Sequence, residues 1–83
     1  MDATAVFAKV KQVAWESIEG VDEKKITLEA SLVKDLGADD MDTVELIMGL
    51  EDEFKITIPE TDTEKLVTVK DVVDYLCAKT REV

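Results

Sequence analysis

The segment Leu36-Gly37-Ala38-Asp39-Asp40-Met41-Asp42-Thr43-Val44-Glu45-Leu46 has the pattern of a loop followed by an acidic helix. An acidic residue at a helix start accepts hydrogen bonds from unpaired backbone N–H groups. It also lies favourably at the positive end of the helix dipole. We therefore expect this helix to begin near Asp39 or Asp40.

The body of this helix carries two apolar stripes. Spacings of three and four place one set of side chains on a buried face, and this set comprises Leu46, Ile47, Leu50 and Phe54. Met41, Val44 and Met48 form a second stripe among acidic residues. Flexible thioethers inside a charged rim are typical of a recognition surface. On spacing alone, however, Met41 and Met48 could equally complete the core.

Three further helical segments are predicted. The first runs from about Thr4 to Glu19, with Gly20 as its end signal, and Trp15 falls at the border of its apolar stripe. A short helix over 60–66 follows the extended connection 55–59, and Thr68 resembles the N-cap of a last helix. The long connection over 21–39 can attach to the core through Ile26, Leu28, Leu32 and Leu36. The pattern predicts an all-α protein.

Much of the chain resembles the acyl carrier proteins. The resemblance rests on the run from Ala30 to Asp39, on Asp42-Thr43-Val44-Glu45-Leu46, and on the shorter matches Glu53-Phe54, Ile58-Pro59, Glu64-Lys65 and Asp74-Tyr75-Leu76. It implies a single domain over residues 1–83, folded as a four-helix bundle with a long first loop and a short third helix. It also implies an interior cavity bordered by Leu32, Leu46, Ile58, Leu66 and Val72.

Position 40 departs from the family pattern. Acyl carrier proteins have a serine here, which is esterified by 4'-phosphopantetheine, whereas this chain has Asp40. An aspartate attacking the same phosphorus would give an acyl phosphate, which hydrolyses. Ser17 falls in a helical pattern and Ser31 in the long connection, so neither replaces the missing serine. We expect no cofactor on this chain, and 4'-phosphopantetheine only if Asp40 were Ser.

Two explanations of Asp40 stay open. The aspartate could serve helix stability alone, contributing about 0.3 to 1 kcal/mol at a first-turn position, or it could reflect drift. Alternatively, the aspartate has a new role. The origin of the residue is also open: it could be an engineered substitution that keeps a carrier protein unmodified, or it could be the native residue of a paralogue that docks without cargo.

Composition limits the classes of partner. Twenty acidic residues against ten basic ones give a net charge of −10, which argues against binding nucleic acid or anionic membranes. The segment 35–54 holds eight acidic residues and no basic one. The chain has no histidine and one cysteine, Cys77, which favours a reducing compartment. With no apolar run of membrane-spanning length and no secretory signal, we expect a cytoplasmic monomer.

The resemblance also implies a docking surface on the acidic helix. Its expected partners are acyl-processing enzymes with Arg/Lys patches, together with a phosphopantetheinyl transferase that binds without modifying the chain. The matching positions are Asp39, Met41, Asp42, Val44, Glu45, Met48, Glu51 and Asp52. The implied function is that of an acyl carrier protein-like module of fatty acid or related acyl or polyketide biosynthesis.

Two other classes of function fit the sequence less well. An acidic regulatory or metal-associating domain is conceivable, but the spacing of Asp39, Asp40, Asp42 and Glu45 does not match a calcium loop, so only weak cation association is expected. An enzyme is disfavoured, because these carboxylates fall on a polar face with no companion nucleophile. No catalytic or metal-binding residue is predicted.

Overall fold

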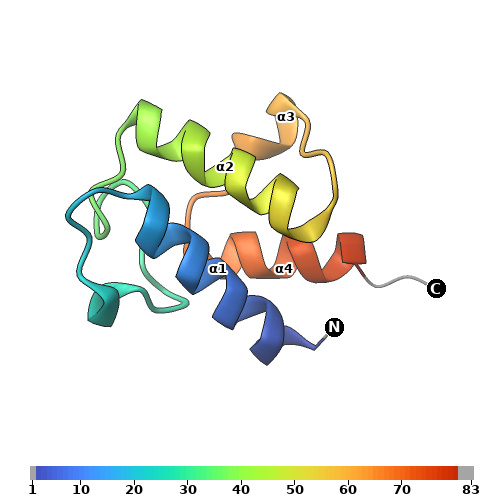
Figure 1. Ribbon diagram of the computed structural model, residues 1–83, viewed down its shortest axis with the longest axis horizontal. Helices are drawn as coiled ribbons and strands as arrows, with labels where there is room; N and C mark the ends of the chain where they lie inside the picture. The colour runs from blue at the N-terminus through green and yellow to red at the C-terminus, as the bar shows by residue number, and fades with distance from the viewer. Residues whose placement is uncertain (1, 81–83) are drawn as a thin grey trace.

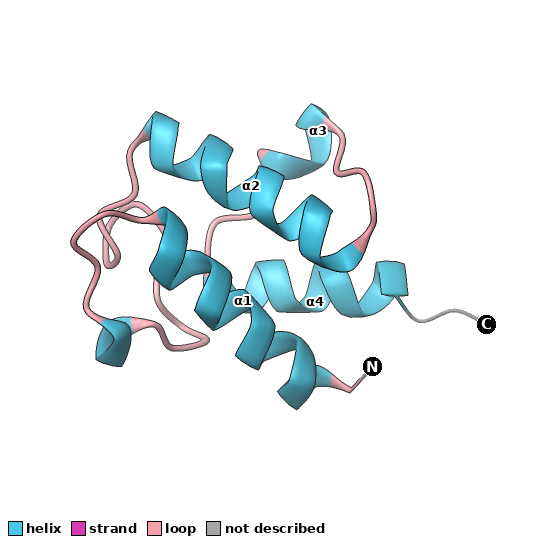
Figure 2. Cartoon of the chain, viewed as in Figure 1, coloured by secondary structure: helices cyan, strands magenta, loops and turns pink. Residues whose placement is uncertain are grey.

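The computed structural model describes residues 2–80 and is helical. Its elements are α1 (Ala3–Ser17), the 3-10 helix η1 (Glu23–Lys25), α2 (Asp40–Phe54), α3 (Glu60–Thr63) and α4 (Val69–Thr80). Within residues 2–80 there is no strand, only an isolated bridge between Ser31 and Thr68 (Figure 2). The prediction of a four-helix bundle with a long first loop and a short third helix is confirmed.

Local signals set most helix ends. Asp2 caps α1 by accepting a hydrogen bond from the N–H of Ala5 at 2.9 Å. The helix ends at Ser17, two residues before the predicted Glu19, and Gly20 lies in the following turn with φ +78°. At α4, Thr68 Oγ1 accepts from the N–H of Asp71 at 3.1 Å, so the predicted N-cap is confirmed. In return, the Asp71 carboxylate accepts from the backbone N–H groups of Thr68 at 3.0 Å and Val67 at 3.1 Å, and these two hydrogen bonds lower the pKa of Asp71.

The prediction for the third helix was too long. α3 ends at Thr63, and the chain continues to Leu66 through turns in which Lys65 N–H donates to the Asp62 carbonyl at 3.0 Å. No residue of α3 is buried. Instead the hydroxyl of Tyr75 on α4 donates to the Asp62 carboxylate at 2.7 Å and links α3 to α4. Most of the stability of a helix in a protein comes from packing of its apolar face. Because α3 has no buried face, it is not stabilised beyond one turn.

The core forms where α1 packs against both α2 and α4 (Figure 1). Full burial of one aliphatic side chain contributes about 1.5 to 3 kcal/mol, so this core is the main source of stability. The fully buried large side chains are Val6, Val10, Ile18, Ile26, Leu46, Leu50, Val69, Val72 and Leu76. Of the predicted α2 face, only Ile47 is half-buried rather than buried. Cys77 is half-buried at the core's edge.

The long connection between α1 and α2 is attached as predicted. Ile26, Leu32 and Leu36 are buried and Leu28 is half-buried. Leu32 N–H donates to the Val67 carbonyl at 3.0 Å, which joins the connection to the segment before α4. This segment fills the end of the bundle at the left of Figure 1 and places Asp39 at the start of α2.

None of the helices described over residues 2–80 is both long and apolar enough to cross a membrane.

Candidate functional site

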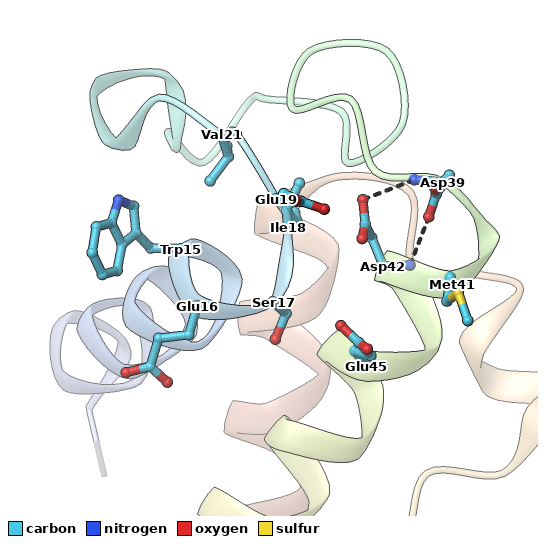
Figure 3. A pocket seen from close by; sticks show the side chains of 11 residues that line it. Trp15, Glu16, Ser17, Ile18, Glu19, Val21, Asp39, Met41, Asp42 and Glu45 are labelled. Atoms are coloured by element: carbon cyan, nitrogen blue, oxygen red, sulfur yellow. Dashed lines mark hydrogen bonds between the residues drawn. The ribbon is translucent and has the colours of Figure 1, made fainter.

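Asp39, not Asp40, caps α2. Asp39 Oδ1 accepts from the N–H of Asp42 at 2.8 Å, and Asp42 Oδ2 accepts from the N–H of Asp39 at 3.4 Å (Figure 3). The Thr43 hydroxyl donates to the Asp39 carbonyl at 2.9 Å. This capping box satisfies the helix start locally, so α2 begins where the sequence predicted.

Asp40 is the first residue of α2 and is exposed. Within residues 2–80 its carboxylate has no hydrogen bond and no basic group within 4.0 Å. Since Asp39 already supplies the cap, the stabilising role left to Asp40 is its interaction with the helix dipole, worth about 0.3 to 1 kcal/mol. The Asp40 carboxylate is therefore exposed to solvent and unpaired among residues 2–80.

The residues at this position do not fit a phosphopantetheine ester. Three hydroxyl side chains line the same hollow as Asp40, those of Ser31, Thr43 and Thr63. Thr43 and Thr63 already donate to carbonyls of their own helices, at 2.9 and 2.6 Å, and Ser31 Oγ accepts from Lys34 N–H at 3.2 Å. The side chain at position 40 itself is a carboxylate, which offers no alcohol oxygen.

An apolar groove begins beside Asp40 and follows α2. Its first hollow, about 510 Å³, lies between the long connection, α2 and the segment after α3. A second hollow of about 310 Å³ continues along α2 towards Ile58 and shares Thr43, Val44 and Thr63 with the first. We call the two together the α2–α3 groove. Of the five residues expected to border an interior cavity, half-buried Leu66 and buried Leu32 and Ile58 line this groove. Leu46 and Val72 are buried and line neither hollow.

The second apolar stripe of α2 faces solvent. Met41 is 70% exposed, Met48 60% and Val44 56%. The alternative that Met41 and Met48 complete the core is therefore wrong. Val44 and Met48 line the α2–α3 groove, whereas Met41 lines a hollow between α2 and the end of α1, together with Asp42 and Glu45 (Figure 3).

The acidic residues predicted for docking differ in their surroundings. Asp39, Glu45 and Asp52 are exposed, and Asp42 is half-buried in the capping box. Glu51 is half-buried, and its carboxylate accepts from the Ile58 N–H at 2.7 Å, so it holds the turn after α2. Of the eight acidic residues over 35–54, Glu53 forms an ion pair of 2.9 Å with Lys9 of α1. The hydrogen bond from Lys9 lowers the pKa of Glu53.

Sequence reasoning missed two residues of the groove. Val33 is 64% exposed and Val67 is 56% exposed, and both line the hollow beside Asp40. The sequence does show these two valines in connecting segments, outside any helical apolar stripe. It does not show that the two segments lie side by side, because this depends on the fold.

A third hollow, about 620 Å³, lies on the opposite side of α2, between its first turns and the end of α1 (Figure 3). Trp15, exposed as its border position predicted, lines it together with Glu16, Glu19 and Glu45. In the part of the chain that the structure describes, the carboxylates do not gather into a group of three or more that could hold a metal ion. The metal-associating alternative gains no support from this geometry.

A comparison with protein-family models gives a match to the family described as "Phosphopantetheine attachment site" over residues 12–76. The matched region runs from α1 to α4 and includes Asp40 and the whole α2–α3 groove. Carrier domains of this kind are not themselves catalytic. The chain therefore belongs to the phosphopantetheine attachment-site family, the family of acyl carrier protein-type domains.

Proposed function

We propose that this chain is a carrier-type docking module of fatty acid or related acyl biosynthesis, which binds acyl-processing enzymes through α2 and carries no covalent arm. The observation that supports the proposal most is the exposed, unpaired carboxylate of Asp40, at the position that the sequence resemblance assigns to the attachment serine. Without an alcohol at this position, the chain cannot bear the phosphopantetheine arm that would hold an acyl group. The other exposed residues of α2 stay available for docking.

The exposed part of α2 supports the docking role. Glu45 and Asp52 are exposed and have no basic group within 4.0 Å among residues 2–80. Exposed Met48 lies between them along the helix, and exposed Val44 directly precedes Glu45. An apolar centre with a charged rim is the usual composition of a protein interface. Unpaired acids of one sign attract Arg/Lys patches over a distance, which raises the association rate and makes it sensitive to salt.

The test is binding to a purified carrier-dependent acyltransferase by calorimetry at low salt. Reversing both charges, in Glu45→Lys with Asp52→Lys, should weaken binding on the order of 10-fold. Glu23→Lys with Glu29→Lys is the charge-matched control, because both are exposed acids between α1 and α2 that line none of the three hollows. Equal affinity of the double variant and the control would overturn the docking role of α2.

A further inference from the structure

The mismatch at position 40 concerns charge as well as covalent chemistry. A serine at position 40 would leave the chain with one negative charge fewer than its −10. A phosphodiester formed on that serine is a monoanion at neutral pH and would restore the charge. With its aspartate, this chain therefore has the net charge of a loaded carrier while it carries no arm.

The position of the charge matters as much as its amount. Asp40 lies on the rim of the first hollow of the α2–α3 groove, where Val33, Val44 and Val67 are exposed. Lys34 also lines this hollow, but no ion pair within 4.0 Å joins it to Asp40. The carboxylate is thus available to a cation from outside, next to an apolar surface.

An enzyme that accepts loaded carriers must place the phosphodiester charge against its own surface. Covering an anion without a compensating cation is costly, so such an enzyme needs an Arg or Lys at that point. A phosphopantetheinyl transferase meets an uncharged serine there instead. The two classes of partner therefore need different charges opposite position 40.

We propose that the Asp40 carboxylate takes the place of the phosphodiester charge, so that enzymes acting on loaded carriers bind this chain in preference to a neutral, unloaded form. The inference rests on the proposed docking function and names the class of partner. The bound group is an Arg or Lys of the enzyme, paired with Asp40, while apolar side chains of the enzyme cover the first hollow.

The test compares the binding affinity of the parent chain with that of the Asp40→Asn, Asp40→Glu and unmodified Asp40→Ser variants. The two binding partners are the acyltransferase and a purified phosphopantetheinyl transferase. For the acyltransferase at low salt, the Asn and Ser variants should bind about three-fold more weakly, and the Glu variant should bind as the parent does. The difference should vanish near 1 M salt, where the Debye length is about 3 Å. For the phosphopantetheinyl transferase, the Ser variant should bind at least as tightly as the parent.

Glu29→Gln controls for net charge, since it removes one exposed negative charge away from the groove, and it should bind the acyltransferase as the parent does. Equal acyltransferase affinity for Asp40 and Asp40→Asn would overturn this inference. If Glu45→Lys with Asp52→Lys still weakened binding, the proposed function would stand without it. If that double variant also had no effect, the proposed function would fail as well. Circular dichroism of each variant verifies that the helices are intact.

Discussion

The carboxylate of Glu51 accepts a hydrogen bond from the backbone N–H of Ile58 across 2.7 Å. The backbone carbonyl of the same residue accepts from the N–H of Lys55 and, at 3.1 Å, from that of Ile56. Glu51 therefore holds the turn in which α2 ends and the chain reverses towards α3. Its position on the acidic helix had predicted a partner contact, but its carboxylate is already engaged within the fold.

Replacing Glu51 with alanine should destabilise the protein. The change leaves the Ile58 N–H without its acceptor, and hydrogen bonds to charged groups contribute about 1.5 to 3 kcal/mol, so we expect a loss of about 1.5 kcal/mol in the free energy of unfolding. Urea denaturation followed by circular dichroism measures it. Asp52→Ala is the control, since exposed Asp52 forms no hydrogen bond within residues 2–80. Equal stability of the two variants would show that the turn does not depend on Glu51.

Gly49 permits the close approach of α1 and α2. A Cβ atom on Gly49 would lie 2.8 Å from Cγ1 of Val13, a β-branched side chain in the core. Alanine gains about 1 kcal/mol in helix propensity, but overpacking costs about 1 to 3 kcal/mol. Gly49→Ala should therefore lower the free energy of unfolding by about 1 kcal/mol.

A double-mutant cycle identifies the cause. Val13→Ala removes the atom that Gly49→Ala would strike, so the alanine at 49 should become stabilising in the Val13→Ala background. If Gly49→Ala has the same destabilising effect in both backgrounds, the contact with Val13 is not what keeps a glycine in α2.

The hydroxyl of Tyr75 should titrate late. Burial, the hydrogen bond to Asp62 and the negative charges of Asp62 and Glu51 raise the pKa of Tyr75 from 10.0 to about 12. The folded state keeps a proton that the unfolded state loses, so this contribution to stability is complete below pH 10 and disappears as the pH rises to about 12.

Tyr75 is the chain's only tyrosine, so tyrosinate absorbance reports on it alone. The native protein should show a midpoint near 12, and the urea-denatured protein one near 10. Coincident midpoints would mean that the link between α3 and α4 is open in solution. Asp62→Asn tests the cause: the pKa should shift back towards its ordinary value once the carboxylate charge is removed.

Added salt should stabilise the fold. The two ion pairs within residues 2–80, Lys9 with Glu53 and Lys70 with Asp74, involve substantially exposed side chains, and such pairs contribute little. Repulsion among the charges that make up −10 is then the larger electrostatic effect. Between about 0.01 M and about 0.15 M NaCl the Debye length falls from about 30 to about 8 Å.

Screening on this scale should raise the melting temperature by about 4 to 8 °C, which corresponds to about 1 kcal/mol for a domain of this size. Scanning calorimetry in NaCl and in KCl measures the change, and the two salts should agree because screening does not depend on ion identity. A fall in melting temperature with added salt would show that attractive pairs dominate the folded state.

The features predicted from sequence are those set by local signals. The start of α2 follows from a capping box that spans four residues, and the buried stripes follow from spacings within single helices. The end of α3 was missed because helix length depends on packing against other elements, and no residue of α3 is buried in the folded chain. The contact that links α3 to α4 joins Asp62 to Tyr75, 13 residues later in sequence. The role of Glu51 depends on an N–H beyond the turn, and the first hollow combines Val33, Val44 and Val67 from three segments. Spacing within one element cannot reveal contacts of this kind.

Asp40 should prevent attachment of the phosphopantetheine arm. The most direct test is an intact-mass measurement after incubation with coenzyme A and a broad-specificity phosphopantetheinyl transferase. The chain with Asp40 should keep its mass, and the Asp40→Ser variant should gain one phosphopantetheine group under the same conditions. A phosphopantetheine adduct on the chain with Asp40 would show that the protein is loaded despite the aspartate.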